Sequence, residues 1–362
     1  MKRIPTLAVA SFLCLMTLIP CISVNAVEDG PERALPQSHL IADVPFHAQF
    51  NGIFCGVGSM AIVLDYLGPE IDQKEIADVA RTTNAGTYPA DVVRTGQFSK
   101  LSSAKGDYFH GSVPTEGFKE RSMGYAAFGY CSDTFWLGDL KALIAADIPV
   151  IVLMTYSPGG TASHWRVVIG YDDAQQRVYF CDTWGRDILK LNDSGIISWS
   201  YHDFEIGWNY RGEDTRHPYC EHPYFGAIFL PWSVDISVNG KAEPGSTVEV
   251  EADITYPCPS PFDVSQFPAK DAFAEISLPD GMTLVGSQQQ TMIGSLQAGA
   301  GVSVTWKAQC DQGIPQGASI EVTAAGIISG SLPEAFYWGN SDACYPGYSY
   351  TDLIGGMSSV AI

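Results

Sequence analysis

The chain has few cations for its length. Its 362 residues include 20 Lys and Arg against 40 Asp and Glu, which gives a formal net charge of −20 at pH 7. Nucleic-acid binding relies on Lys and Arg that neutralise phosphates. The charge balance therefore excludes nucleic acid as an expected partner. It also disfavours anionic surfaces and favours solubility.

Long hydrophobic runs are scarce as well. The clearest one extends from Leu7 to Ile19, follows Lys2 and Arg3, and precedes the small residues of Val24-Asn25-Ala26. This run is too short to span a membrane, and the order of charged, apolar and small residues is typical of a cleavable secretory signal. We therefore expect residues 1–26 to be a signal peptide. The protein would then be secreted or extracytoplasmic, without an integral membrane segment.

The number of cysteines is odd after the expected processing. Nine Cys fall to seven, namely Cys55, Cys131, Cys181, Cys220, Cys258, Cys310 and Cys344. In an oxidising compartment six can pair and one stays free, and we expect the free one to be Cys55. Three of the other six (Cys131, Cys181 and Cys220) precede residue 233 and three follow it, so complete pairing needs at least one disulfide between these two parts of the chain. The alternative of a lipid-modified Cys21 is disfavoured by Pro20 directly before it.

A candidate nucleophile stands at the start of an apolar helix. Cys55 precedes Gly-Val-Gly-Ser-Met-Ala-Ile-Val-Leu, a pattern that predicts a helix from Cys55 to Leu67, ended by Gly68-Pro69. A thiol attacks as the thiolate, and a helix N-terminus and an imidazolium both lower its pKa. A Cys in such a place is more often merely buried or disulfide-bonded. The functional interpretation therefore depends on its partners.

His164, Asp182 and Gln49 are the expected partners. His164 opens one strand-like run, Asp182 ends the next, and a turn at 172–176 joins the two runs as a hairpin. The hairpin would bring a general base and the carboxylate that orients it to the same end of adjacent strands. Gln49 stands six residues before Cys55 and is placed to donate a hydrogen bond to a developing oxyanion.

The order Gln, Cys, His, Asp resembles that of papain-like cysteine hydrolases. Further motifs that match one group among them are Asp43–Gln49, Cys55-Gly56, Ala61–Gly68, Phe135–Ile144, Ile148–Leu153, His164–Asp172 and Tyr179–Asp182. They resemble the bacteriocin-processing-type (double-glycine-leader peptidase-like) cysteine peptidases over about residues 40–232. The resemblance implies Cys55 as nucleophile, His164 as base, Asp182 as its orienter and Gln49 as oxyanion donor. It also implies a peptide or protein substrate and no cofactor.

Two positions depart from that resemblance. Val57 and Thr183 stand where the family usually carries Pro, although neither change removes a catalytic group. No nucleotide-binding loop and no bundle of membrane-spanning helices accompanies the motifs. We therefore do not expect a transporter-fused leader peptidase.

From residue 233 the pattern changes to strict alternation of apolar and polar residues. The alternation covers 248–256, 302–310 and 320–324, and turn signals separate these runs. It predicts an antiparallel β-sandwich over residues 233–362, similar to the immunoglobulin-like accessory modules of extracellular enzymes. Such a module can contact a cell surface or polymer, or merely space the catalytic domain.

Two segments allow more than one interpretation. Residues 86–132 are rich in Gly, Ser and aromatics with weak periodicity, and we interpret them as an insertion that lines the substrate cleft. His217, Cys220 and His222 could bind a metal ion such as zinc. They lie in a loop-like segment, and Cys220 is wanted for a disulfide, so we expect no metal site.

The sequence thus predicts an α+β papain-like catalytic domain over 40–232, followed by an all-β sandwich domain over 233–362. The expected function is that of a secreted cysteine peptidase that works through an acyl-enzyme. Two alternatives stay open. One is amidase or transpeptidase chemistry on the same scaffold, and the other is a binding module that has lost turnover.

Overall fold

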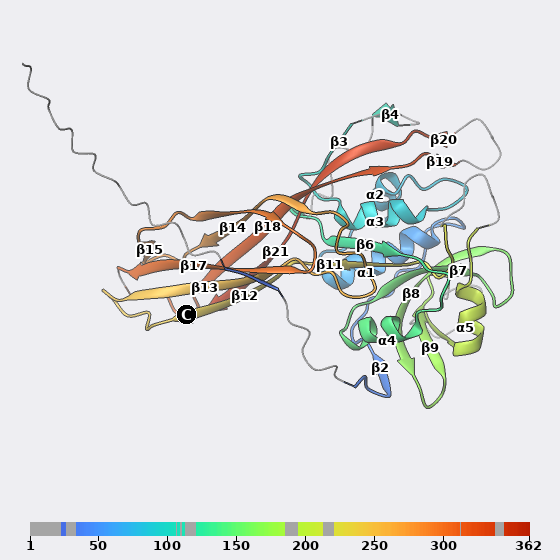
Figure 1. The fold of residues 1–362 in the computed structure, drawn as a ribbon, viewed down its shortest axis with the longest axis horizontal. Coiled ribbons are helices and arrows are strands. Elements are labelled where there is room, and N and C mark those ends of the chain that lie inside the picture. The colour runs from blue at the N-terminus through green and yellow to red at the C-terminus, as the bar shows by residue number, and fades with distance from the viewer. Residues whose placement is uncertain are drawn as a thin grey trace, which may run out of the picture.

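The structure is a computed structural model. It describes residues 23–26, 34–105, 107–108, 111–112, 121–184, 195–212, 221–311, 313–336 and 344–362. We call residues 34–232 the helical lobe and residues 233–362 the sheet lobe. Two long strands of the sheet lobe extend beside the helices of the helical lobe (Figure 1).

The described part of the helical lobe has five helices, which are α1 (Cys55–Leu67), α2 (Gln73–Val79), α3 (Pro89–Gln97), α4 (Leu137–Ala145) and α5 (Tyr201–Trp208). Helix α1 has the predicted bounds. It is held by the burial of every residue from Gly56 to Leu64. Helix α2 begins after Asp72, whose carboxylate accepts a hydrogen bond from the backbone N–H of Lys74, as an N-cap does.

Helix α3 corrects the interpretation of residues 86–132 as a cleft insertion. Pro89 occupies its first turn, and nearly all of its residues are buried, including the polar Asp91, Arg94 and Gln97. Because these polar side chains occupy buried positions, the apolar periodicity that marks a helix is weak here. Strand β6 (Ala126–Tyr130) also lies in this stretch. The segment therefore belongs in large part to the core of the lobe.

The helices cover both faces of an antiparallel sheet. Its strands are β10 (Ile196–Ser200), β9 (Arg177–Cys181), β8 (Ser163–Asp172), β7 (Val150–Thr155), β11 (Gly226–Leu230) and β6 (Ala126–Tyr130) in spatial order, with β2 (Ser38–Leu40) added on β8. Helices α1, α2 and α3 share one apolar cluster with one face, and α4 and α5 share another with the opposite face. The hairpin of β8 and β9 pairs Asp172 with Arg177, which confirms the predicted turn.

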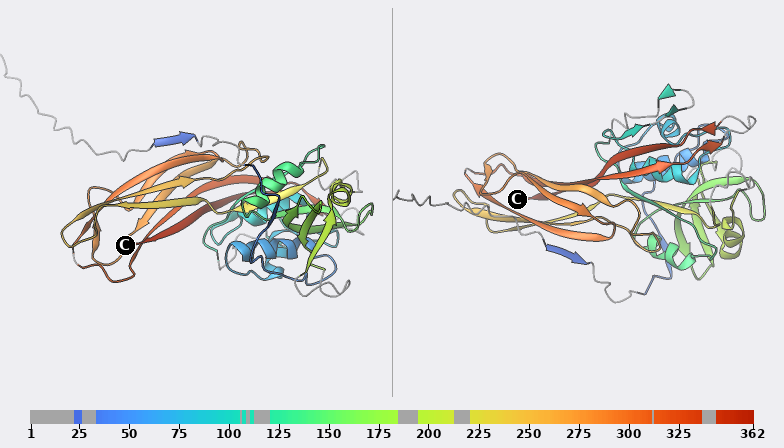
Figure 2. Two further views of the ribbon diagram at one scale, coloured as in Figure 1. Left: turned by 90° about the horizontal axis from the view of Figure 1, so that it is seen from below. Right: turned by 45° about the horizontal axis from the view of Figure 1, so that its top comes forward.

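Two large sheets form most of the sheet lobe, and each includes one strand from outside residues 233–362. One contains β1 (Ser23–Ala26), β17 (Ala300–Cys310), β13 (Thr247–Thr255), β12 (Ser233–Asn239) and β15 (Met282–Leu284), and the other contains β16 (Gln290–Leu296), β14 (Ala269–Ser277), β18 (Ser319–Leu332), β21 (Tyr348–Ala361) and β3 (Ser103–Lys105). The predicted alternation is confirmed, since inward residues such as Val250 and Val322 are fully buried in one shared core. Figure 2 shows the long strands of the two sheets from two further sides.

Short strand pairs complete the described structure: β4 (Asp107–Tyr108) with β5 (Gly111–Ser112), and β19 (Ala335–Phe336) with β20 (Cys344–Tyr345).

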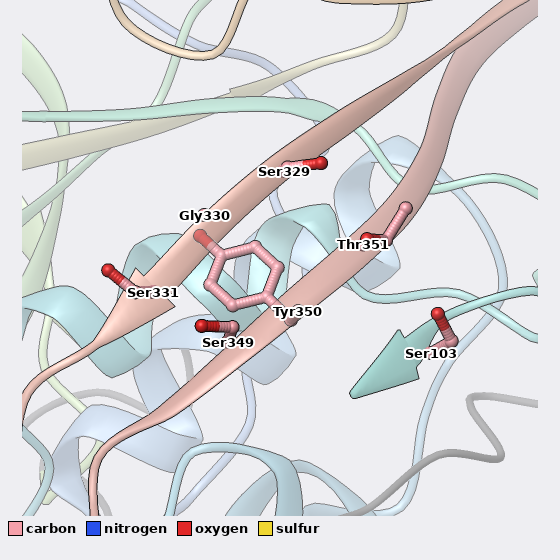
Figure 3. A pocket seen from close by; sticks show the side chains of 7 residues that line it. All are labelled: Ser103, Ser329, Gly330, Ser331, Ser349, Tyr350 and Thr351. Atoms are coloured by element: carbon pink, nitrogen blue, oxygen red, sulfur yellow. The ribbon is translucent and has the colours of Figure 1, made fainter. Parts of the chain in front are cut away.

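A pocket of about 560 Å³ lies on the paired strands β18 and β21. It is lined by Ser103, Ser329, Gly330, Ser331, Ser349, Tyr350 and Thr351 (Figure 3). The Tyr350 ring lies against Gly330, where a Cβ would meet the tyrosine oxygen at 2.4 Å. Glycine is therefore required opposite this ring.

The two lobes share one hydrophobic core. Phe128 of β6 and Tyr256 of the sheet lobe stack at a centroid distance of 6.1 Å, and Trp232 stacks on Tyr256 at 4.9 Å. Strand β3 of the helical lobe pairs with β21 of the sheet lobe. The division at residue 232 stays a prediction, because packing and hydrogen bonds continue across it.

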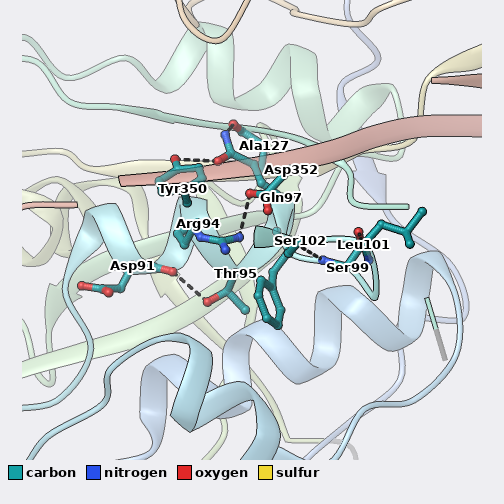
Figure 4. A network of polar contacts seen from close by, with 12 residues as sticks. Asp91, Arg94, Thr95, Gln97, Ser99, Leu101, Ser102, Ala127, Tyr350 and Asp352 are labelled. Atoms are coloured by element: carbon teal, nitrogen blue, oxygen red, sulfur yellow. Dashed lines mark hydrogen bonds and ion pairs between the residues drawn. The ribbon is translucent and has the colours of Figure 1, made fainter. Parts of the chain in front are cut away.

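Buried polar groups join the lobes as well (Figure 4). Arg94 of α3 contacts Asp352 of β21 at 2.7 Å, and both side chains are fully buried. The Arg94 guanidinium lies over the Tyr350 ring at 4.3 Å, and the Tyr350 hydroxyl donates to Gln97 Oε1 at 2.8 Å. Helix α3 is thus anchored to β21 through its C-terminal half.

The cysteine pairing scheme is wrong for the described residues. Cys181, Cys258 and Cys310 are free thiols. Cys181 lies in the cluster beneath α1 and Cys310 in the core of the sheet lobe, so their sulfurs belong to separate interiors. Burial raises the pKa of the Cys181 thiol to about 12 and that of Cys258 to about 11, which leaves both unreactive. Cys220 lies outside the described residues.

Three further predictions concern the signal peptide, the absence of a membrane-spanning segment and the absence of a metal site. Most of the expected signal peptide, with Cys21, lies outside the described residues, but Ser23–Ala26 pairs with β17 as β1. No helix of the described residues is long and apolar enough to cross a membrane. The same residues contain no group of three or more His, Cys, Asp or Glu that could hold a metal ion, and His217 and Cys220 lie outside them.

Candidate active site

Cys55 is the first residue of α1, His164 lies at the start of β8, and Asp182 directly follows β9. Their side chains come together at one end of the sheet, since the Cys55 side chain forms a hydrogen bond with His164 and His164 forms one with Asp182. Because β8 and β9 are adjacent and antiparallel, His164 and Asp182 lie side by side, and His164 Nε2 contacts Asp182 Oδ1 at 2.9 Å. The two side chains are 3% and 2% exposed, so this contact is shielded from water.

Gly56 lets α1 approach β8 closely. A Cβ at this position would lie 2.9 Å from Thr87 and 3.1 Å from Trp165, the residue after His164. Trp165 is itself fixed, since its indole N–H donates to the carbonyl oxygen of Thr87 at 3.2 Å. The small residue after Cys55 therefore brings the helix start to the strand that carries His164.

Cys55 and His164 shift each other's protonation in opposite directions. Burial alone would raise the pKa of the Cys55 thiol, but a hydrogen bond to His164 and the imidazolium charge outweigh it and hold this pKa below its ordinary value. Burial alone would lower the pKa of His164, but hydrogen bonds to Asp182 and Cys55 raise it above the ordinary value. Because Asp182 occupies Nε2, Nδ1 is the ring nitrogen left for the thiol. These directions favour a thiolate–imidazolium pair.

Asp182 is held as a carboxylate by several donors. Burial alone would raise its pKa, but the hydrogen bond from His164 and the charge of Arg166 outweigh burial and hold the pKa well below its ordinary value. The backbone N–H of Trp184 also donates to Asp182 Oδ1 at 2.9 Å. A permanently ionised carboxylate can orient the imidazole and stabilise its charged form.

Arg166 is a site residue that the sequence reasoning missed. Its Nε donates to Asp182 Oδ2 at 2.8 Å, and its terminal nitrogens donate to the carbonyl oxygens of Thr155 and Tyr156 at 3.1 and 2.8 Å. The guanidinium also lies over the Trp199 ring at 4.7 Å. Only its position in the sequence could have indicated it. Arg166 stands two residues after His164 on a strand, and residues at that spacing point to the same side of the sheet.

Replacing Arg166 by Met is expected to destabilise the fold. The change leaves a buried carboxylate without its cation and removes a donor from each of two carbonyl oxygens, so the free energy of unfolding should fall by about 3 kcal/mol. Urea unfolding followed by fluorescence measures this loss. Arg177→Met on β9 is the matched control, because Arg177 is half-buried and, among the described residues, its side chain donates hydrogen bonds to Ser198 alone. A loss no larger than that of the control would contradict the structural role of Arg166.

Aromatic rings enclose the imidazole. Tyr156 and Trp184 lie edge-on to His164 at centroid distances of 5.4 and 6.4 Å, and 5.9 Å from each other. These rings limit the access of water to the His164–Asp182 contact. A lower local dielectric strengthens each charge interaction in the site.

Gln49 lies beside the same strand end. Its backbone N–H donates to the carbonyl oxygen of Thr183 at 3.0 Å, and the Thr183 hydroxyl donates to Gln49 Oε1 at 2.8 Å. Gln49 Nε2 donates to the carbonyl oxygen of Asn51 at 2.6 Å. The structure therefore brings Gln49, Cys55, His164 and Asp182 to one end of the sheet. Such a set can carry out acyl transfer through a thiol.

The sequence of this region matches a known family. Residues 41–214 match the Peptidase_C39 like family, which supports the assignment of the chain as a cysteine peptidase, a hydrolase. Among solved structures the chain is similar to xylellain, a cysteine protease from Xylella fastidiosa. The identity is 15%, the TM-score is 0.36, and the similarity covers 54% of this chain and 87% of that chain. No curated protein matches the chain.

Proposed function

We propose that the protein is a papain-like cysteine peptidase that cleaves peptide bonds through Cys55, His164 and Asp182, with Gln49 as oxyanion donor. The observation that carries this proposal is the coupling of Cys55 with His164, which lowers the pKa of the thiol and raises that of the imidazole. A merely structural Cys in an apolar interior has a raised pKa, as Cys181 does.

The reaction would proceed through an acyl-enzyme. The Cys55 thiolate attacks the carbonyl carbon of the scissile bond, and the resulting oxyanion accepts hydrogen bonds from Gln49 Nε2 and the backbone N–H of Cys55. That backbone N–H lies in the first turn of α1, where it has no partner within the helix. Protonated His164 gives its proton to the leaving amine. As neutral imidazole it then activates the water that hydrolyses the thioester.

The sequence motifs support proposals on the substrate, on the location of the enzyme and on the role of the sheet lobe. The resemblance to double-glycine-leader peptidases favours substrates with Gly-Gly before the scissile bond. The predicted signal peptide favours a secreted or extracytoplasmic enzyme. The alternating strands of the sheet lobe favour an immunoglobulin-like module, which would contact a cell surface or polymer. A peptide panel with Gly-Gly, Gly-Ala and Ala-Ala before the cleavage site, incubated with the full chain, tests the substrate class.

The pH dependence of the site is a sharp test. Because the pKa of Cys55 is lowered, iodoacetamide should alkylate it at pH values where an ordinary thiol, with a pKa of about 8.5, is protonated. Because the pKa of His164 is raised, kcat/KM should fall at a pH above the ordinary imidazole pKa of about 6.5. The resulting profile is a bell between the two pKa values.

His164→Ala is the control for this profile. Without the imidazolium, the alkylation of Cys55 should shift to the pH range of an ordinary or buried thiol. Peptide mapping after alkylation identifies the labelled residue. A Cys55 that stays inert at every pH in the folded chain would contradict the peptidase proposal and favour a binding role.

A further inference from the structure

We propose that Thr183 is the positioning residue of the oxyanion donor: its hydroxyl holds the Gln49 carboxamide in the orientation that presents an N–H to the reacting carbonyl. The inference rests on the proposed function. It concerns a position where this chain departs from the motif it resembles, which usually carries Pro after the Asp.

The carboxamide of Gln49 is anchored at both ends. Oε1 accepts from the Thr183 hydroxyl at 2.8 Å, and Nε2 donates to the carbonyl oxygen of Asn51 at 2.6 Å. A carbonyl oxygen only accepts, so Asn51 decides which end of the amide carries the NH2 group, and Thr183 holds the other end. An NH2 group has two N–H donors and Asn51 uses one. The second is available for an oxyanion.

Packing fixes the direction of the Thr183 hydroxyl. The side chain is 1% exposed, and its Cγ2 and Cβ face Gly58 of α1, where a Cβ would lie at 2.8 and 3.1 Å. A β-branched side chain with its methyl group held in this way has one accessible rotamer. In that rotamer the hydroxyl faces Gln49.

The backbone around Gln49 is held independently of this hydroxyl. The Gln49 N–H donates to the carbonyl oxygen of Thr183 at 3.0 Å. On the other side, Gln73 of α2 accepts from the Phe50 N–H at 3.0 Å and donates to the carbonyl oxygen of Ala48 at 2.8 Å. Loss of the hydroxyl should therefore release the carboxamide without moving the main chain.

Two neighbouring residues thus orient the two halves of the catalytic apparatus. Asp182 holds the imidazole through His164 Nε2, and Thr183 holds the oxyanion donor through Gln49 Oε1. A donor fixed before the reaction stabilises developing charge without reorganisation. The segment after β9 therefore sets the geometry of both groups at once.

The test is Thr183→Val, which keeps the branched shape against Gly58 and removes only the hydroxyl. We expect kcat on the cleaved peptide to fall on the order of 10-fold, because a Gln49 carboxamide that is no longer fixed stabilises the oxyanion less well. KM should stay unchanged, since this hydrogen bond forms only as charge develops in the transition state. Thr183→Ser keeps the hydroxyl but lacks the methyl group that fixes its direction, so its kcat should lie between those of Thr183→Val and the wild type. The pH dependence of Cys55 alkylation should not move, because the Cys55–His164 pair is untouched.

A double mutant separates positioning from a structural effect. Gln49→Ala alone should lower kcat on the order of 100-fold, and Thr183→Val should have no further effect in that background. An equal loss in both backgrounds, or an unchanged kcat, would overturn the inference. If the wild-type chain hydrolyses no peptide, the proposed function fails. The side-chain amide resonances of Gln49, assigned by their loss in Gln49→Ala, then decide: unchanged shifts in Thr183→Val overturn the inference, and shifted resonances support it.

Discussion

Cys55→Ala is expected to reduce peptide hydrolysis by a factor on the order of 10⁴ to 10⁶, the scale found when a nucleophile is removed from a catalytic triad. The loss follows from the mechanism, because the substituted chain has no atom that can form the thioester. The fold should persist. Cys55 is half-buried at the start of α1, and the residues that hold this helix, Gly56 to Leu64, are unchanged. Rates of hydrolysis and thermal unfolding, measured on the same preparation, separate the two effects.

The matched control is Cys258→Ala. Cys258 is also a half-buried free thiol, but burial raises its pKa to about 11, and it lies in the sheet lobe. This variant should hydrolyse peptides at the wild-type rate. His164→Ala should be nearly as severe as Cys55→Ala, since neither proton transfer step then has a carrier. Wild-type rates in Cys55→Ala would refute the mechanism.

Local signals in the sequence account for what could be predicted. The apolar run after Cys55 and the Gly68-Pro69 stop define α1, and the turn at 172–176 defines the β8–β9 hairpin. Each signal lies within about 15 residues of chain. The alternation of apolar and polar residues likewise predicts the strands of the sheet lobe, because one face of each strand packs inward. From these elements alone, His164 and Asp182 are expected at one strand end.

Contacts between distant segments account for what could not be predicted. Helix α3 buries Arg94 and Gln97 because β21, more than 250 residues later, supplies their partners. The role of Thr183 depends on Gln49 and Gly58, and that of Arg166 depends on Asp182 and two carbonyl oxygens. The predicted pairing of the cysteines was wrong for the same reason. Parity shows how many thiols can pair, whereas only the fold shows which sulfurs can meet.

Truncation of the chain after Trp232 is expected to abolish both folding and activity of the helical lobe. It removes the partners of α3 and of strand β3, and it exposes the face of the core where Phe128 stacks on Tyr256. It also removes the Gly355 carbonyl oxygen that accepts from the Trp232 N–H at 3.1 Å, and the Leu353 carbonyl oxygen that accepts from the Gly124 N–H at 2.8 Å. Circular dichroism and hydrolysis assays on residues 27–232 test this. A fragment that folds and cleaves peptide as the full chain does would show that the lobes are independent.

A point substitution in the full chain tests the same dependence without removing a lobe. Asp352→Ala leaves the Arg94 guanidinium buried between Phe98 and Tyr350 without its counter-charge, so the free energy of unfolding should fall by about 3 to 5 kcal/mol. Asp235→Ala, at an exposed position of β12, should change it by no more than about 0.5 kcal/mol. The double variant Arg94→Met with Asp352→Leu should recover part of the loss, because it removes both charges of the pair, while the buried Arg121 still loses the nearby charge of Asp352. If Asp352→Ala proved as mild as Asp235→Ala, the contact between α3 and β21 would contribute little to stability. The expected loss after truncation would then rest on the shared hydrophobic core alone.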